Sequence, residues 1–213
     1  MAHGVKEKLR GAFSGSRPRK YHMNTVFYHY IASESDLEET AAAIAEADVI
    51  AVDVEADSMF HFTERVCLLQ MATETGCYIV DPLAVGDLSP IAPVFADPAI
   101  IKVFHGADYD VRSLYRDFYI TISNLFDTEI ASRFLGYSYT SLDAVLHRHF
   151  DVTLDKKFQK KDWSRRPLNE EMLAYAADDV RYLVALYHEL KTALAEKDRL
   201  EWVWQTCAAL AGV

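Results

Sequence analysis

Apolar residues in the first half of the chain gather in short runs that polar or turn-forming residues separate. The runs are rich in β-branched and aromatic residues, which is typical of strands. Two of them are separated only by the residues Glu-Thr-Gly, which predicts a hairpin. The pattern therefore predicts strands over residues 25–31, 48–57, 65–73, 77–81 and 100–106.

Segments with helical spacing of apolar residues lie between and after these strands. The first begins with serines followed by acidic residues, as helix N-termini often do. The sequence predicts helices over residues 33–47, 90–96, 108–118, 125–136, 141–150 and 168–197, and a last one from about residue 198. Strands that come early as a hairpin-containing group, with one returning between helices, predict an α/β fold with a mixed β-sheet flanked by α-helices.

The strand-like segment Asp-Val-Ile-Ala-Val-Asp-Val-Glu-Ala-Asp, residues 48–57, contains two acidic residues in its apolar run. Residues two apart on a strand point to the same face, so Asp53 and Glu55 lie side by side. Two buried carboxylates repel each other and are costly without a cationic partner. The pair predicts either that the strand has reached the surface or that a cation lies between the two acids.

More acidic residues follow the strand at 100–106. Asp108 and Asp110 lie in the first turn of the helix predicted after it, where the helix dipole alone favours acids. His105 lies at the end of the strand. It is either a satisfied polar residue of the core or a contact to the same site.

The last long helix contains the sequence Tyr-Ala-Ala-Asp-Asp, residues 175–179. Tyr175 and Asp179 are four residues apart and share a helix face. This face continues into the apolar stripe through Leu183 and Leu186. Asp178 lies about 100° around the helix and is predicted to be exposed. An acid on the buried stripe requires a partner, which makes Asp179 a candidate site residue.

Asp53, Glu55, Asp110 and Asp179 together form a candidate acidic site. Four converging carboxylates need divalent cations to neutralise them. Oxygen ligands alone favour Mg²⁺ or Mn²⁺ over zinc. Two such ions about 3.5–4 Å apart form the usual clamp for attack on a phosphodiester, and a nearby tyrosine hydroxyl can orient the attacking water.

Composition and charge restrict the range of functions. The 213 residues are 51% hydrophobic and 25% charged, as in an ordinary globular protein, and the formal net charge of −10 argues against a broad basic surface for long duplex nucleic acid. Cys67, Cys77 and Cys207 form no metal-binding or disulfide pattern, and there is no apolar run of membrane-spanning length. These features predict a cytoplasmic protein. A polar, basic segment at residues 151–167 is either a phosphate contact or a solvated loop.

The three acidic motifs resemble, in order, those of the DEDD superfamily of exonucleases. They are Asp-Val-Glu (53–55), Asp110 within Val-Phe-His-Gly-Ala-Asp-Tyr-Asp, and Tyr-Ala-Ala-Asp-Asp (175–179). A tyrosine four residues before the last aspartate resembles the DEDDy branch. The flanking sequences resemble the catalytic domain of ribonuclease D and of the catalytic subunits of nuclear exosomes, from about residue 24 to 195.

This resemblance implies a ribonuclease H-like fold and metal-dependent 3′→5′ exonucleolysis that releases nucleoside 5′-monophosphates. It implies that Asp53 bridges two metal ions, that Glu55 and Asp179 hold the ion that activates water, and that Asp110 serves the second ion. Tyr175 would orient the nucleophile. Met59 and Phe60 lie where the family wedges or stacks the terminal bases, and His105 is a further candidate substrate contact.

The resemblance leaves several alternatives open. The expected substrate is the 3′ end of single-stranded or short RNA, and the alternatives are a DNA-directed exonuclease or a non-catalytic scaffold that binds RNA or protein. Residues 1–23 are expected to be a flexible basic arm and residues 24–213 a single exonuclease domain. Ribonuclease D itself has helical domains after its catalytic domain, so the short C-terminus here resembles that of relatives acting on very short oligoribonucleotides. The region of Trp202 and Trp204 is expected either to pack on the domain or to form an interface.

Overall fold

A computed structural model describes residues 27–212, and its centre is one mixed sheet. The strands lie in the order β1-β4-β3-β2-β5-β6. Their bounds are β1 His29–Ile31, β2 Val49–Ala56, β3 Val66–Ala72, β4 Cys77–Val80, β5 Ile101–Phe104 and β6 Leu125–Asp127. β3 is antiparallel to both of its neighbours, whereas β1 pairs with β4, β2 with β5 and β5 with β6 in parallel.

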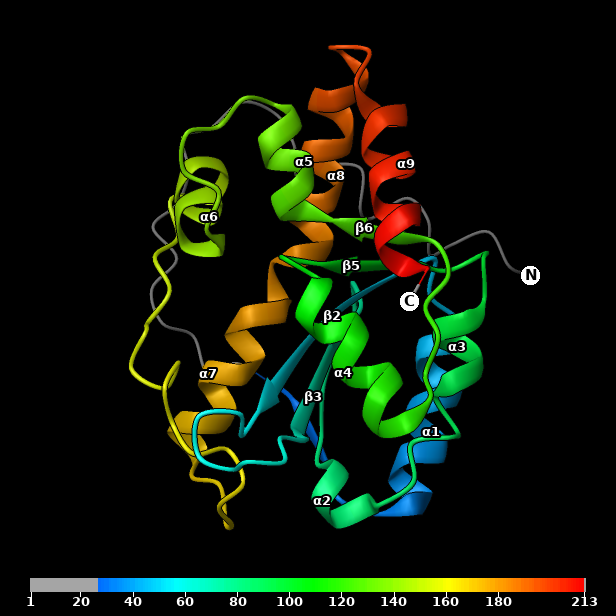
Figure 1. Cartoon of the computed structure of the whole chain (residues 1–213), viewed down its shortest axis with the longest axis vertical. Coiled ribbons are helices and arrows are strands. Elements are labelled where there is room, and N and C mark those ends of the chain that lie inside the picture. Colours follow the sequence, from blue (N-terminus) through cyan, green and yellow to red (C-terminus); the bar gives the residue numbers. More distant parts are fainter. Residues whose placement is uncertain (1–26, 213) are drawn as a thin grey trace, which may run out of the picture.

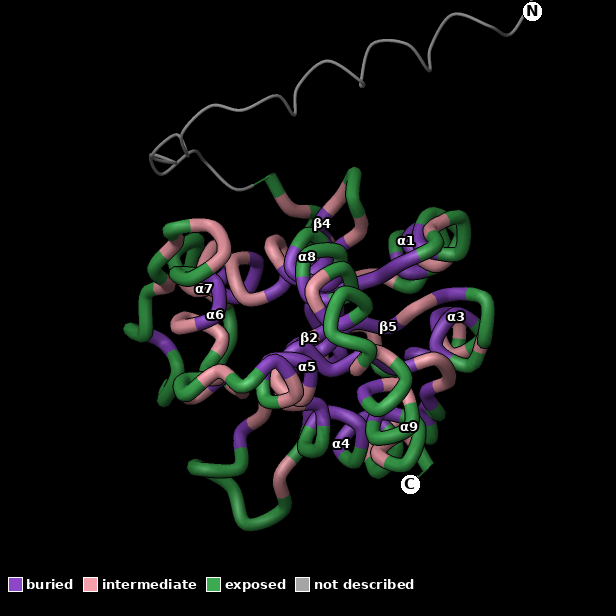
Figure 2. The backbone as a smooth tube through the Cα atoms, turned by 90° about the horizontal axis from the view of Figure 1, so that it is seen from above, coloured by how far each residue is buried: buried purple, intermediate pink, exposed green. Residues whose placement is uncertain are grey.

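Helices flank this sheet on both sides (Figure 1). α7 and α8 pack against the central strands, whereas α1 and α3 lie on the opposite side of the sheet from α7 (Figure 2). Their bounds are α1 Glu34–Ala45, α2 Pro82–Val85, α3 Ala92–Ala96, α4 Asp108–Phe118, α5 Thr128–Phe134, α6 Leu142–Phe150, α7 Glu170–Arg181, α8 Leu183–Ala195 and α9 Leu200–Ala211. The predicted α/β class with a mixed, helix-flanked sheet is confirmed.

The core lies between the sheet and these helices. Its position explains why apolar and polar residues do not simply alternate along the central strands. Every residue of β3 is buried, and so are the first four residues of β2. A strand that is covered on both faces is apolar throughout, and Figure 2 shows this buried centre around β2 and β5. β2 becomes partly exposed only from Asp53 onward, at its carboxyl end.

Two predicted helices differ in the structure. The helix predicted over 125–136 begins only at Thr128, because residues 125–127 pair with β5 as strand β6. The long helix predicted over 168–197 is two helices, α7 and α8, which meet at Tyr182. α7 begins two residues later than predicted, after Asn169, whose side chain accepts a hydrogen bond from the Met172 N–H at 2.8 Å. The predicted stripe residues Leu183 and Leu186 are buried on α8.

Further predictions concern the hairpin, the N-terminal arm, the cysteines and the two C-terminal tryptophans. The hairpin between 65–73 and 77–81 is confirmed as the antiparallel pair β3–β4. The predicted arm at residues 1–23 lies outside the residues that the structure describes. The three cysteines are buried and unbridged. Trp204 packs on Phe126, with ring centroids 5.1 Å apart, whereas Trp202 stays about half exposed. Within residues 27–212, no helix has the length and apolar character to cross a membrane, and the cytoplasmic location stays a prediction.

Candidate active site

The carboxyl end of β2 presents two acidic side chains to one face of the sheet. Asp53 pairs with Gln70 and Glu55 with Leu68 on the antiparallel strand β3. The register then shifts, because Ala56 pairs with Val66 and leaves Cys67 as an extra residue on β3. Such a bulge bends a strand and ends regular pairing. The two acids therefore lie where β2 leaves the sheet.

Asp110 comes from the first turn of α4, which follows β5. Asp127 fixes this turn. Its carboxylate accepts hydrogen bonds from the backbone N–H groups of Gly106 and Ala107, at 3.0 and 2.8 Å. The same carboxylate caps α5 through the N–H groups of Glu129 and Ile130. One buried aspartate thus ties the start of α4, and with it Asp110, to the neighbouring strand β6.

α7 presents Tyr175 and Asp179 to the acids of β2. One ligand atom each from Asp53, Glu55 and Asp179 lies within 4.8 Å of the other two. Asp178 points elsewhere, because its carboxylate bonds Arg181 at 2.8 Å and its side chain is 39% exposed. The helix facing predicted from the sequence thus agrees with the observed placement of these two aspartates.

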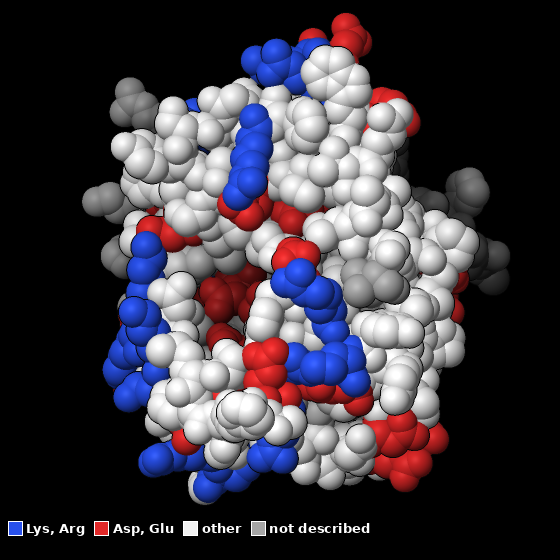
Figure 3. Space-filling view, viewed as in Figure 1, with Lys and Arg blue, Asp and Glu red and all other residues white. Residues whose placement is uncertain are grey.

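An acidic hollow lies on one face of the molecule. Figure 3 shows recessed acidic side chains on the face seen in Figure 1, in the region where α7, α4 and the end of β2 meet. Asp110 is buried and is not one of the three mutually close carboxylates. Its charge still contributes to the raised pKa of Glu55, and the charge of Asp53 contributes to the raised pKa of Asp110. All four predicted acids therefore belong to one electrostatic cluster.

Burial and mutual repulsion make these acids hard to ionise together. Burial raises the pKa of Asp53 to about 7, and burial together with the Asp53 charge raises the pKa of Asp179 to about 8. The pKa values of Glu55 and Asp110 are raised well above their usual range, first by burial and then by the Asp53 charge. Added positive charge would therefore strongly favour the ionised cluster.

Tyr175 lies within reach of the charges of the acidic cluster and is held by two aromatic rings. The ring of Phe158 lies edge-on to it with centroids 5.8 Å apart, and the ring of Trp163 is 6.1 Å away. Burial, followed by the charges of Asp179 and Glu55, raises the pKa of the Tyr175 hydroxyl. The hydroxyl thus stays protonated near neutral pH.

Phe158 and Trp163 belong to the basic segment, residues 151–167, which an ion pair between Arg166 and the buried Asp81 fixes to the sheet. The Arg166 guanidinium bonds both carboxylate oxygens of Asp81 at 2.5 and 2.6 Å. It also donates to the carbonyl of Cys67 at 2.8 Å and to that of Trp163 at 2.7 Å. The rings that hold Tyr175 are therefore anchored through Arg166 to strands β3 and β4.

The three predicted substrate contacts lie in different surroundings. Met59 and Phe60 follow β2 and are 66% and 47% exposed, so their side chains are available to a ligand. The described contacts of His105 are to residues outside the acidic cluster. Its Nδ1 lies 2.9 Å from the Thr128 hydroxyl, and the backbone of Thr140 also hydrogen-bonds to the ring. Burial lowers the pKa of this imidazole.

Sequence reasoning missed Asp127 and Arg166 as residues that position the site. Asp127 precedes Thr-Glu, and an aspartate before a helix is a recognisable cap signal that the predicted helix start obscured. Arg166 lies 85 residues from Asp81 in the sequence, and no local pattern indicates that pairing. Its neighbour Arg165 has the same residue type but is 83% exposed.

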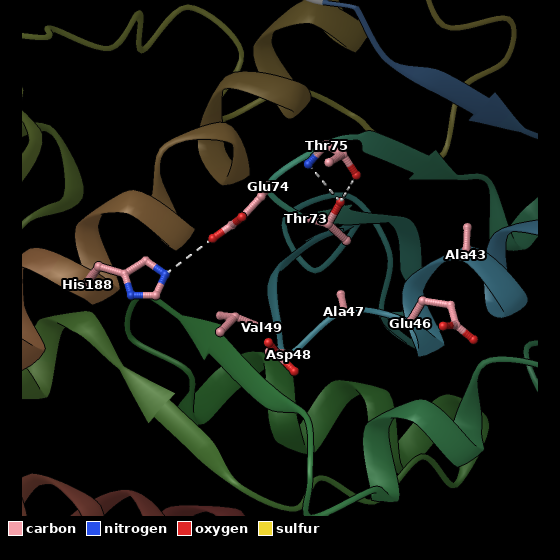
Figure 4. Close-up of a pocket in the computed structure, with 9 residues that line it drawn as sticks. All are labelled: Ala43, Glu46, Ala47, Asp48, Val49, Thr73, Glu74, Thr75 and His188. Carbon is pink, nitrogen blue, oxygen red and sulfur yellow. Dashed lines mark hydrogen bonds and ion pairs between the residues drawn. The ribbon is translucent and has the colours of Figure 1, made fainter. Parts of the chain in front are cut away.

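A second hollow lies at the opposite end of β2. It has a volume of about 290 Å³ and is lined in part by Glu46, Asp48, Glu74 and His188 (Figure 4). His188 Nε2 lies 3.7 Å from a Glu74 carboxylate oxygen, and both side chains are mostly exposed. The hollow contains none of the four clustered acids, so it is separate from the candidate active site.

Comparisons with known proteins agree with this geometry. The human protein "Exosome complex component 10" is 38% identical over 183 residues, which are 83% of this chain and 21% of that protein. The catalytic core of RRP6 from Trypanosoma brucei superposes with a TM-score of 0.85 and 38% identity, covering 88% of this chain and 52% of that one. Escherichia coli RNase D superposes with a TM-score of 0.81 and 28% identity, covering 87% and 50%.

The chain thus spans about a fifth of the length of the curated relative and about half of these solved chains. A family model described as "3'-5' exonuclease" matches residues 28–195, which include all four clustered acids and Tyr175. The likeness to the two solved catalytic structures also agrees with the ribonuclease H-like fold expected from the motifs. From the family match and the shared fold, the chain belongs to the 3′-5′ exonuclease family of RRP6 and ribonuclease D.

Proposed function

We propose that this protein is a metal-dependent 3′→5′ exoribonuclease that removes nucleoside 5′-monophosphates from the 3′ end of single-stranded or short RNA. The observation that carries the proposal is the placement of Asp53, Glu55 and Asp179 with ligand atoms within 4.8 Å of one another. Family membership supports the reaction class. The human exosome component and the bacterial RNase D support RNA as the substrate.

The chemistry of the donor set fits divalent cations. Carboxylate oxygens without nitrogen or sulfur donors suit Mg²⁺ or Mn²⁺. The pKa values of about 7 for Asp53 and about 8 for Asp179 indicate a cluster whose own charges are poorly compensated by the protein. We propose two such ions, held by Asp53, Glu55 and Asp179 at one position and by Asp53 and Asp110 at the other.

Two bound ions supply an activated water and stabilise the leaving oxygen of a phosphodiester. The protein contributes the arrangement of groups around them. The Asp53 charge acts on Glu55, Asp110 and Asp179 alike, so we propose that this carboxylate serves both ions. Glu55 is two residues further along the strand and is proposed to contact the 3′-hydroxyl of the terminal ribose as well.

Tyr175 is proposed to orient the attacking water. Because the pKa of its hydroxyl is raised, Tyr175 acts as a neutral hydrogen-bonding group and not as the base that removes the proton. Its position depends on the rings of Phe158 and Trp163. The hydroxyl is thus oriented by a preformed aromatic wall.

The surroundings of the hollow suit a single strand. Met59 and Phe60 expose apolar side chains on which terminal bases can stack without regard to sequence. The basic segment carries six lysines and arginines against three aspartates, although the chain as a whole has a net charge of −10. Lys160 and Lys161 are both exposed on this segment, close to Phe158. We propose that they contact the phosphates upstream of the scissile bond.

The direction and sugar preference are tested by matched oligonucleotides. RNA and DNA of the same sequence, 5′-labelled, are incubated with Mg²⁺ or Mn²⁺, and a second pair carries a blocked 3′ end. The proposal predicts stepwise shortening of the free RNA from its 3′ end, with 5′-monophosphates as products. If DNA is shortened faster than RNA, the preferred substrate is DNA and not RNA. Internal cleavage of the blocked strands would contradict the proposed 3′→5′ exonuclease reaction.

A further inference from the structure

Gln70 on β3 has a buried side-chain amide without a protein partner. Its side chain is 0% exposed. Neither its Oε1 nor its Nε2 atom has a hydrogen-bond partner among the residues that the structure describes. Buried amides are nearly always hydrogen-bonded, because leaving them unpaired is unfavourable. An unpaired glutamine amide in the centre of a sheet therefore suggests a role other than packing.

The strand register places this amide beside the candidate metal site. Gln70 pairs with Asp53 on the antiparallel strand β2 and with Ile79 on β4. Directly opposite residues project from the same face, with Cβ atoms about 4.5–5.5 Å apart. Asp53 is therefore the polar member of the two cross-strand neighbours, and Ile79 is the apolar one.

One helix packs over the strands of this row. α7 packs over β2, β3 and β4. Two of its fully buried residues, Ala176 and Ala177, have side chains that carry no polar atom. The small alanines allow the helix to lie close to the sheet. In the cross-strand row of Gln70, the polar neighbour of the amide is therefore the Asp53 carboxylate.

We propose that Gln70 is a positioning residue for the metal site: in the cation-bound protein its Nε2–H group, which has no partner in this structure, donates to the Asp53 carboxylate and fixes the orientation in which that carboxylate binds the divalent cations. This inference rests on the proposed function. Carboxylates that bind metals are themselves commonly hydrogen-bonded, and such outer partners orient the ligand. The backbone N–H of Val54 is a further donor to the Asp53 carboxylate. An amide from β3 would fix the carboxylate from a second direction.

Melting in EDTA and cation binding distinguish the proposed role of Gln70 from a purely structural one. If the amide only supports the fold, Gln70→Met lowers the melting temperature in EDTA and leaves cation binding as it was. If the amide acts through Asp53, the isosteric apolar side chain removes an unpaired polar group, so the melting temperature in EDTA stays the same or rises. Affinity for Mn²⁺ then falls by about tenfold or more, the usual effect of removing a partner of a metal ligand.

The experiment measures Mn²⁺ binding by calorimetry and thermal melting in EDTA for the wild type, Gln70→Met and Leu69→Met. Leu69 is the matched control, because it is the adjacent buried residue and pairs with Val54 on the other face of the sheet. We expect Leu69→Met to bind Mn²⁺ as the wild type does. Gln70→Met with wild-type affinity, or with a lower melting temperature in EDTA, overturns the role of Gln70. A wild type that binds no Mn²⁺ overturns the proposed function itself.

Discussion

Replacing Arg166 by methionine removes the anchor of the segment that holds Tyr175. The Arg166 side chain is 26% exposed and that of its partner Asp81 is 2% exposed. The substitution keeps the aliphatic volume but removes the two bonds to the Asp81 carboxylate, at 2.5 and 2.6 Å, and those to the carbonyls of Cys67 and Trp163. Asp81 is left as a buried carboxylate without its cation.

Removing one partner of a buried ion pair costs roughly 3–5 kcal/mol, because the other charge stays buried. Two donors remain to Asp81, the Tyr30 hydroxyl and the Leu83 N–H, at 2.5 and 3.0 Å. They partly offset the loss, so the expected cost is about 3 kcal/mol at pH 7. For a protein of this size, such a change lowers the melting temperature by roughly 6–12 °C.

The loss of unfolding free energy in Arg166→Met should depend on pH in a defined direction. Burial raises the pKa of Asp81, but hydrogen bonds from Arg166 and Tyr30 outweigh it, and the net pKa is lowered. In the wild type this carboxylate therefore stabilises the fold above its unfolded pKa of about 4, and the contribution is lost as pH falls through the lower folded pKa. In Arg166→Met the pKa of Asp81 rises instead, so protonation relieves the penalty. The stability gap between the two proteins should narrow as pH falls from 7 toward 4.

Urea unfolding of the wild type and Arg166→Met at pH 7, 5.5 and 4 measures this gap. Arg165→Met is the matched control, since Arg165 is 83% exposed and pairs only with Asp162 among the described residues. It should unfold like the wild type at each pH. A gap below about 1 kcal/mol at pH 7, or one that does not change with pH, would mean that Arg166 does not stabilise the fold through the Asp81 carboxylate.

Three further predictions concern the site and its surroundings. Asp53→Asn should keep its fold, as checked by circular dichroism, and lose more than about 100-fold in turnover, since even partners of metal ligands contribute 10–100-fold. Asp179→Asn should lose turnover while Asp178→Asn is nearly silent in the same assay, and the reverse result would mean that the facing of α7 is wrong. The double substitution Lys160→Ala and Lys161→Ala should weaken RNA binding in filter-binding titrations. The slope of log affinity against log salt concentration should fall in magnitude by about 1.4, the value for two phosphate contacts on a single strand. An unchanged slope would mean that these lysines do not contact phosphates and that the segment is a solvated loop.

Much of the fold was readable from apolar runs because these runs are the central strands themselves. The hairpin β3–β4 follows from two apolar segments and a three-residue turn sequence. The acids of β2 stand out because a carboxylate is improbable in a buried run. Same-face geometry at i,i+2 on a strand and i,i+4 on a helix then predicted which acids point to a common side.

The errors have physical causes as well. β6 has three residues and runs directly into α5, so its residues resemble the start of a helix until β5 is available to pair with them. The break at Tyr182 lacks the glycine or proline that normally marks a helix end. α7 packs against β2, β3 and β4, whereas α8 packs against β2 and β5, and a single sequence does not encode such packing locally.

Contacts between distant segments were the least predictable part. Arg166 and Arg165 are adjacent and chemically the same, yet one is paired with a buried aspartate and the other is exposed. Gln70 looked like an ordinary strand residue until the register placed it opposite Asp53. Both assignments depend on strand pairing and long-range packing, which are properties of the assembled sheet.

One titration tests directly whether turnover depends on cations bound by the acidic cluster. Mn²⁺ is added to metal-free wild type and to Asp53→Asn, and its binding by calorimetry is compared with the rate at which a 5′-labelled RNA loses its 3′-terminal nucleotide. The account predicts that the wild-type rate rises with occupancy of the site, that EDTA abolishes it, and that Asp53→Asn binds Mn²⁺ weakly and stays inactive. Equal shortening of the RNA in EDTA, or by Asp53→Asn, would contradict a reaction that depends on cations held by these carboxylates.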